Sequence, residues 1–173
     1  MANNLILRKT WPAANFPAPE TLATCHQRKD EMIKNQIFIS YSGHDEFEAS
    51  LLQYAIESSL KDKGVKAWTF ERDQNLSEKE IAGSLKNKVK ESLATIFLVS
   101  PNTLNSGATQ WMELAYSDAF DIDTYVLLHH LEYKELKGRE TGVPPLLLSS
   151  QCNPAMKWSS VISQINSMIE VQK

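Results

Sequence analysis

The sequence predicts an α/β fold, a doubly wound parallel sheet of about five strands with helices on both faces. From residue 36 onward, short apolar segments alternate with longer segments of helical periodicity. The segments at residues 37–39 and 95–99 contain no charged side chain, which is typical of strands covered on both faces. Strands that alternate with helices in this way favour one parallel sheet.

Composition indicates one globular domain of ordinary size with an extension. The chain has 173 residues, of which 42% are hydrophobic and 23% charged, and its formal net charge is -3. Because no basic block stands out, we expect no nucleic-acid partner. No apolar run approaches the length that spans a bilayer, so we expect no membrane partner. Cys25 and Cys152 form no C-x-x-C pair, which fits a reducing cytoplasm and predicts no zinc site.

Residues 1–35 differ from the rest, and we predict an N-terminal arm or extension there, followed by one domain at residues 36–173. The prolines that interrupt any early helix are Pro12, Pro17 and Pro19. The apolar run at residues 5–7 is too short for the core of a signal peptide, so we expect a cytoplasmic location. An ordered arm, a linker and an assembly element all fit this segment.

The first strand, at residues 37–39, runs into a polar turn at Ser42 and Gly43. Asp45 is predicted as the N-cap of the next helix, and Glu48 as its capping-box partner. In open α/β sheets, ligands bind at the carboxyl end of such a strand. An ordinary turn without a ligand has the same pattern.

The next elements follow from apolar spacing and stop signals. A helix over about residues 46–63 ends at Gly64, and a strand follows at residues 65–70. The apolar side chains of this helix are Phe47, Leu51, Leu52, Ala55 and Leu60. Another helix opens at Ser77, with Glu80 as its capping-box partner. Its buried stripe is expected to be Ile81, Leu85, Val89 and Leu93.

The last part of the chain continues the alternation. After the strand at residues 95–99, we expect a helix around residues 110–120, a strand at 124–128 and a polar loop at 134–142. The final helix is capped by Asn153, with Pro154 in its first position. Its apolar face consists of Trp158, Val161, Ile162, Ile165, Met168 and Ile169.

Several familiar site types are absent from the sequence. It contains neither the G-x-x-x-x-G-K phosphate loop nor the G-x-G-x-x-G pattern. His129 and His130 are adjacent in a predicted strand, so their side chains are expected on opposite faces, and no metal site is predicted. Ser42, His44 and Asp45 contain the residue types of a catalytic triad, but neighbours in a tight turn seldom meet in triad geometry.

Three loops are expected to converge at the carboxyl edge of the sheet, at residues 41–45, 71–76 and 100–109. Glu113 starts the helix after the third loop, where the helix dipole stabilises a carboxylate. Taken alone, Glu113 reads as a solvated helix residue. Arg72 and Asp73 alone read as surface charges, and Trp68 and Trp111 as core residues.

The residues at these positions resemble the Toll/interleukin-1 receptor (TIR) domain family. Residues 37–42 resemble its first conserved box, and residues 69–73 the start of its second loop. Residues 97–106 followed by 111–114 are similar to the stretch that holds the family's catalytic glutamate. The match covers roughly residues 36–170 in the family's order, and implies a flavodoxin-like fold.

The resemblance implies one of two roles, cleavage of NAD+ or recruitment of other TIR domains as an adaptor. It places the catalytic glutamate at Glu113. The other implied substrate-binding or pocket-gating residues are Tyr41, Ser42, Gly43, Arg72, Asp73 and Trp111. The chain departs from the family at the tryptophan that often stands four residues before the glutamate, because that position is Thr109 and Trp111 comes two residues before. The second loop also lacks the glycine common in the family.

We therefore expect a TIR domain of the bacterial NAD-consuming type, an NAD+ glycohydrolase or ADP-ribosyl cyclase of antiphage immune signalling. NAD+ would be its substrate, and no cofactor or metal is expected. The implied partners are other TIR domains, through self-association, and a separate sensor or effector protein. The alternative is a non-catalytic adaptor. A phospho-receiver domain is disfavoured because Tyr41-Ser42 and Ser100-Pro101 replace its acidic cluster and its aspartate.

Overall fold

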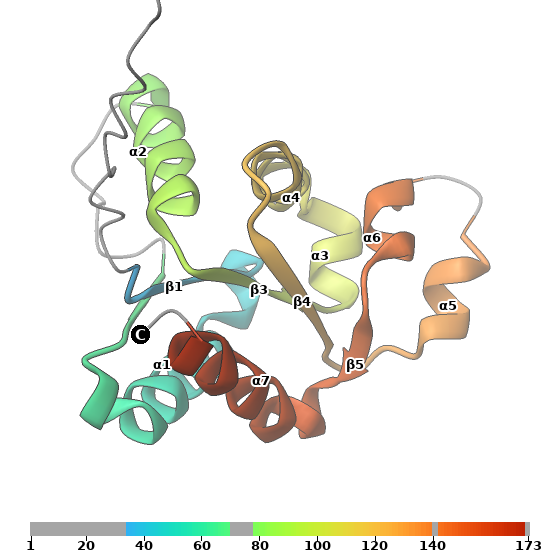
Figure 1. Ribbon diagram of the computed structural model, residues 1–173. Helices are drawn as coiled ribbons and strands as arrows, with labels where there is room; N and C mark the ends of the chain where they lie inside the picture. Colours follow the sequence, from blue (N-terminus) through green and yellow to red (C-terminus); the bar gives the residue numbers. More distant parts are fainter. Residues whose placement is uncertain (1–33, 70–77, 140–141, 172–173) are drawn as a thin grey trace, which may run out of the picture. The chain divides into compact units, whose positions relative to one another are not determined.

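The computed structural model describes residues 34–69, 78–139 and 142–171. Its centre is a five-stranded parallel sheet with the strand order β2-β1-β3-β4-β5, which confirms the predicted fold class (Figure 1). The strands are β1 (Gln36–Ser40), β2 (Lys66–Trp68), β3 (Ala94–Val99), β4 (Asp123–Leu128) and β5 (Cys152–Pro154). The predicted arm at residues 1–35 falls almost wholly outside the described residues and stays a prediction.

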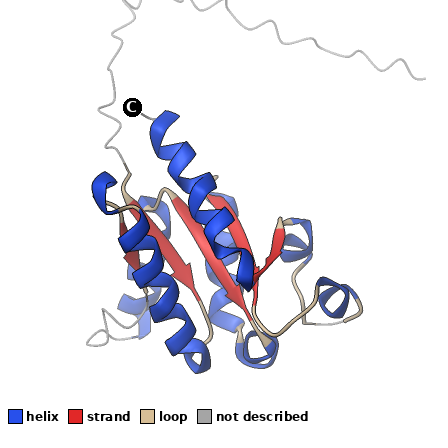
Figure 2. Cartoon of the chain, turned by 90° about the horizontal axis from the view of Figure 1, so that it is seen from below, coloured by secondary structure: helices blue, strands red, loops and turns tan. Residues whose placement is uncertain are grey.

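Helices cover both faces of the sheet. The α-helices are α1 (Glu46–Ser59), α2 (Glu78–Glu91), α3 (Pro101–Ser106), α4 (Ala108–Ala119), α5 (Tyr133–Lys137), α6 (Pro145–Ser149) and α7 (Trp158–Val171). Short 3-10 turns are η1 (Gly43–Asp45), η2 (Lys61–Lys63) and η4 (Ala155–Lys157). Helices α1 and α7 lie side by side on one face, while α2 and α4 lie on the other (Figures 1 and 2).

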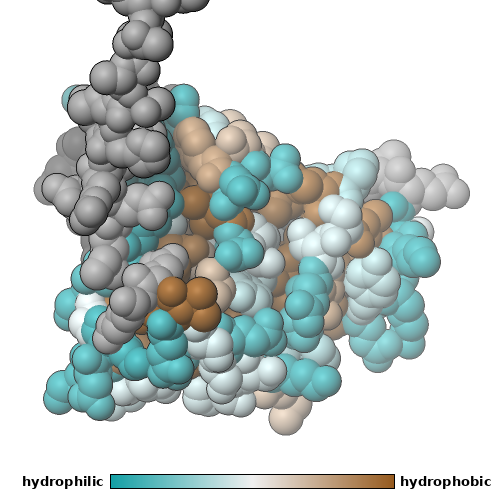
Figure 3. Space-filling view, in the orientation of Figure 1, coloured by the Kyte–Doolittle hydropathy of each residue, from teal (hydrophilic) through white to brown (hydrophobic). Residues whose placement is uncertain are grey.

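The alternation of strand side chains builds a separate core on each face. In β1, Ile37 and Ile39 pack into the cluster beneath α1 and α7. Phe38, between them, stacks on Trp68 of β2 under α2, with ring centroids 5.1 Å apart. All six residues of β3 are buried, as expected of a central strand. On the face shown in Figure 3, apolar side chains appear between hydrophilic ones.

The strand order reverses between β1 and β3. From β1 the chain moves to β2 on one side, and β3 then pairs on the other side of β1. Their last paired residues are Ser40, where β1 ends, and Phe97, while β3 continues to Val99. The carboxyl ends of β1 and β3, here called the switch point, are where open α/β sheets bind ligands.

The first predicted helix is correct in position but wrong in its end, and its apolar side chains do not all lie on the buried face. Helix α1 ends at Ser59 and is followed by η2. Gly64 then ends the helical segment in the left-handed region, with a φ of +66°. Its buried side chains are Ala49, Leu52 and Ile56. Phe47 and Leu51 are exposed instead. The helix carries two apolar stripes, and periodicity alone does not say which one meets the sheet.

Other boundaries also differ from the prediction. Asn153 and Pro154 do not cap the last helix, because they extend β5 beside β4, and α7 begins only at Trp158. The predicted polar loop at residues 134–142 includes most of α5. In the second predicted stripe, Leu93 packs under α1 and α7 rather than under α2, because it follows the end of α2 and enters β3.

The prediction for the two adjacent histidines after β4 is also wrong. His129 and His130 lie beyond the end of the strand, and His130 has a positive φ of 52°. Their ring centroids are 4.0 Å apart, so the side chains do not lie on opposite faces. Within the described ranges, no group of three or more potential ligand side chains could hold a metal ion. None of the helices described is long and apolar enough to cross a membrane.

Candidate active site

Glu113 is a buried carboxyl at the switch point. It lies in the second turn of α4, and its side chain is 4% exposed. The hydroxyl of Ser40, the last residue of β1, donates a hydrogen bond to Glu113 Oε2. The buried positions of α4 are Gln110, Glu113, Leu114 and Ser117, the spacing of a helix face that packs on a sheet. The interpretation of Glu113 as a solvated helix residue is therefore wrong.

The environment of Glu113 favours its neutral form. Burial raises the pKa of this carboxyl from 4.5 to about 8, while the hydrogen bond from Ser40 acts in the opposite direction. At neutral pH the carboxyl is therefore largely protonated, which sequence analysis did not anticipate. A carboxyl whose pKa lies near the working pH is a candidate for a functional group.

Gln110 lies one turn before Glu113 on the same face of α4, and its side chain is 2% exposed. Its amide nitrogen donates to the backbone oxygen of Leu98, at 3.2 Å. Leu98 stands one residue beyond the last pair between β1 and β3. The amide oxygen of Gln110 is buried and has no hydrogen-bond partner among the described residues. Sequence reasoning missed this residue, although its spacing from Glu113 is a usable signal.

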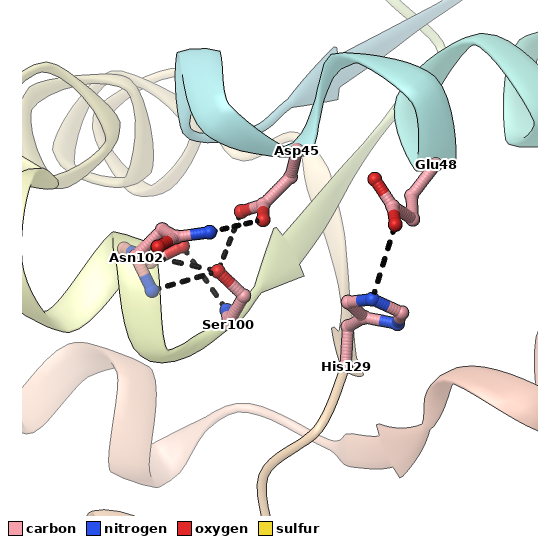
Figure 4. Close-up of polar contacts among 6 residues, drawn as sticks. Asp45, Glu48, Ser100, Asn102 and His129 are labelled. Atoms are coloured by element: carbon pink, nitrogen blue, oxygen red, sulfur yellow. Dashed lines mark hydrogen bonds and ion pairs between the residues drawn. The ribbon is translucent and has the colours of Figure 1, made fainter.

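The first and third loops meet through Asp45, which is also buried. Its carboxylate accepts hydrogen bonds from Ser100 Oγ at 2.5 Å and from Asn102 Nδ2 at 2.7 Å. Figure 4 shows these three side chains pointing toward one another from η1 and the start of α3. Ser100 Oγ also accepts from the backbone N–H of Asn102 and caps α3. The predicted convergence of the loops at residues 41–45 and 100–109 is thus confirmed.

The predicted capping box at the start of α1 is wrong. Asp45 makes no side-chain cap, because its oxygens bond to Ser100 and Asn102 across the sheet edge. Glu48, its expected partner, instead lies 3.5 Å from Nε2 of His129 (Figure 4). A tertiary contact has replaced the local one that the sequence pattern suggested.

The remaining candidate residues are spread around the switch point. Ser42 is buried, and Gly43 is exposed at the start of η1. Tyr41 is half-buried and packs toward the core beneath α1 and α7. Trp111 is half-buried against the cluster that includes Phe97 and Leu114 of the opposite face. Their roles in binding substrate stay predictions.

The second loop cannot be compared with the expectation. Arg72 and Asp73, and the whole predicted loop at residues 71–76, lie outside the described residues. The two residues before the gap, Trp68 and Thr69, are buried beside α2 and α1. The tryptophan thus has the core position that its residue type suggested.

The fold and the order of the site segments match a known family. The family model described as TIR domain matches residues 37–155, which is more than half of the chain. The chain belongs to the TIR-domain family. The match runs from the first strand of the TIR domain, through the helix that carries Glu113, to the start of η4.

Two solved structures show the same fold at low sequence identity, and a third is less similar. The TIR domain of the Toll-related receptor TRR-2 from Hydra magnipapillata is 16% identical, with a TM-score of 0.51, covering 75% of this chain and 97% of that one. A 2-desoxiribosyltransferase from Leishmania mexicana is 15% identical, with a TM-score of 0.55, covering 76% and 97%. The TIR domains of the activated Roq1 resistosome are 14% identical, with a TM-score of 0.48, covering 77% and 84%. No curated protein matches this TIR domain.

Proposed function

We propose that this TIR domain cleaves the bond between nicotinamide and ribose in NAD+. It would act in the cytoplasm as a glycohydrolase or ADP-ribosyl cyclase of bacterial antiphage immune signalling, giving ADP-ribose or a cyclic product. The observation that carries the proposal is the buried carboxyl of Glu113 at the switch point, hydrogen-bonded to the end of β1. NAD+ is the substrate in this proposal, so the reaction needs no further cofactor.

The chemistry of the bond explains why one carboxyl suffices. Nicotinamide leaves as a neutral molecule from a cationic ring, so no general acid is needed to expel it. As the bond breaks, positive charge builds on the ribose, as in glycoside hydrolysis. An ionised Glu113 would stabilise that charge electrostatically, and burial would strengthen the effect. Water, or a group of the same NAD+ molecule, would then attack the ribose and set the product.

The raised pKa of Glu113 adds a step to this mechanism. The neutral acid, which predominates at pH 7, stabilises a cation poorly. A positively charged nicotinamide ring nearby favours the ionised carboxylate, because an opposite charge lowers the pKa of an acid. Binding of NAD+ would therefore promote release of the Glu113 proton to solvent before the bond breaks.

The remaining roles come from the family resemblance. Tyr41 would offer a surface to the base or ribose, while Ser42 and the backbone N–H of Gly43 would hold phosphate oxygens. Arg72 and Asp73 would gate the site, and Trp111 would contact the substrate. A separate sensor or effector protein would activate the domain or receive its product.

The proposal is tested by NAD+ turnover of the purified protein, with the products separated by chromatography. Loss of NAD+ with release of nicotinamide, abolished in Glu113→Gln, would support it, and the second product would identify hydrolysis or cyclisation. Glu48→Gln is the matched control, since Glu48 lies at the same sheet edge but contacts His129. Turnover that survives in Glu113→Gln would contradict the role of Glu113.

The second candidate function is a non-catalytic adaptor that self-associates through TIR–TIR contacts. The observation that favours it is a stripe of large apolar side chains on the outside of α1. Phe47, Leu51 and Tyr54 are 71%, 54% and 73% exposed, at helical spacing. Exposed apolar patches of this kind often mark protein–protein contacts. A folded, self-associating protein without NAD+ turnover at any concentration would favour this function.

A further inference from the structure

The amide of Gln110 is held in one orientation by the backbone. Its nitrogen donates to the Leu98 oxygen, and Thr103 Oγ1 donates to the same oxygen at 3.4 Å. A carbonyl oxygen only accepts hydrogen bonds, so the NH2 end of the Gln110 amide must face Leu98. The amide oxygen is therefore fixed at the other end of the group.

That oxygen is an acceptor without a donor. It is buried and has no hydrogen-bond partner among the residues that the structure describes. Buried polar atoms are nearly always hydrogen-bonded, and an unpaired one destabilises the protein. An unpaired buried acceptor beside a candidate site calls for a donor from a ligand or a water molecule.

Its position ties it to the proposed site. Gln110 and Glu113 occupy successive turns on the inner face of α4, and each contacts a different one of the two strands that end at the switch point. Gln110 bonds to Leu98 of β3, and Glu113 bonds to Ser40 of β1. A ligand that brings its positive charge to Glu113 therefore comes close to the preceding turn of the helix, which carries Gln110.

We propose that Gln110 Oε1 accepts a hydrogen bond from the carboxamide NH2 of the nicotinamide ring and so selects substrates that carry this amide. The inference rests on the proposed function, because it names a specificity residue of the same site. The carboxamide is the donor on the ring that leaves. An analogue with an acetyl group in its place keeps the ring and its charge but offers no N–H, so the oxygen stays unpaired.

The test compares NAD+ with 3-acetylpyridine adenine dinucleotide as substrates. Gln110→Met keeps the length of the side chain and removes the amide. We expect it to lower kcat/KM at least ~10-fold for NAD+ but less than ~3-fold for the analogue, because only NAD+ loses a hydrogen bond to the side chain at position 110. Gln36→Met is the matched control, since Gln36 also donates to a backbone oxygen, that of Lys88, but at the opposite edge of the sheet. Gln36→Met should leave the ratio of kcat/KM for NAD+ to kcat/KM for the analogue unchanged.

Three results would overturn the inference while the proposed function stands. Equal losses on both substrates would mean that Gln110 acts on the ribose or on folding. No loss on either would mean that only water meets the free oxygen. A wild-type protein inhibited equally by nicotinamide and by 3-acetylpyridine would also exclude the hydrogen bond, and this measurement does not depend on a folded variant. Wild-type protein that neither binds nor cleaves NAD+ would instead overturn the proposed function, and the inference with it.

Discussion

The carboxyl group of Glu113 is mostly protonated at pH 7 because it faces the sheet rather than water. In the proposed reaction the ionised form is the active one, so the rate should follow the titration of this group. In the free protein the carboxylate forms as pH rises through about 8. We therefore expect kcat/KM for NAD+ to rise with pH, up to ~10-fold per unit below that value, and to level off above it. Initial rates at low NAD+ between pH 6 and 9.5 measure this profile. A flat profile over that range would contradict an ionised Glu113.

The same carboxyl makes stability depend on pH. Its pKa is higher in the folded chain, about 8, than the ordinary 4.5, so the folded state holds the proton more tightly. The stability that this tighter proton binding gives the folded state is therefore fully present below pH 4.5 and is lost as pH rises through about 8. Above pH 8, Glu113→Gln should be more stable than the wild type, by on the order of 5 kcal/mol at most. Urea unfolding at pH 5 and pH 9 measures this, and equal differences at both values would refute it.

At the scale of elements, the junction between α3 and α4 sets the position of both Gln110 and Glu113. A Cβ at Gly107 would lie 2.3 Å from the backbone oxygen of Thr103, a distance that no real contact allows. Gly107→Ala should therefore displace the start of α4, destabilise the fold by about 1–3 kcal/mol and reduce NAD+ turnover. Thermal unfolding and turnover measure the two effects.

The control for this substitution is a glycine with open space around it. Gly83 lies inside α2, and nothing stands within 4 Å of a Cβ placed there. Gly83→Ala should stabilise the protein by ~0.5–1 kcal/mol, because alanine favours a helix, and should leave turnover unchanged. If Gly107→Ala behaved like Gly83→Ala, the close approach of Gly107 to Thr103 would not control the position of α4.

Elements with a single apolar pattern could be predicted from the sequence, and contacts between distant elements could not. The continuous apolar run of β3 formed as its pattern indicated, and so did the inner face of α7, except that Trp158 is 40% exposed. The stretch containing α4 also formed a helix, yet its pattern did not say that a glutamate would face the sheet. Asp45 is the N-cap residue of α1 as predicted, but it makes no side-chain cap because Ser100, 55 residues away, competes for its oxygens. Local patterns do not contain such partners.

At the scale of the whole molecule, the exposed stripe on α1 predicts that chains associate. Burying Phe47, Leu51 and Tyr54 against another chain removes apolar surface from water. The TIR resemblance implies self-association, and if that assembly completes the site, turnover per chain should rise with protein concentration until assembly is complete. Rates over a concentration series, measured beside light scattering, test this. A rate per chain that stays constant while light scattering reports monomers would exclude it.

A charge within the stripe should separate assembly from folding. Tyr54→Glu places a carboxylate on a side chain that is 73% exposed, so the single chain should fold as before. An interface formed by the stripe would have to bury that charge, and association should weaken at least ~10-fold. Val171→Glu is the control, because Val171 is 88% exposed but lies at the end of α7, outside the stripe. If both variants associated and turned over NAD+ like the wild type, the stripe would not be the surface through which these chains meet.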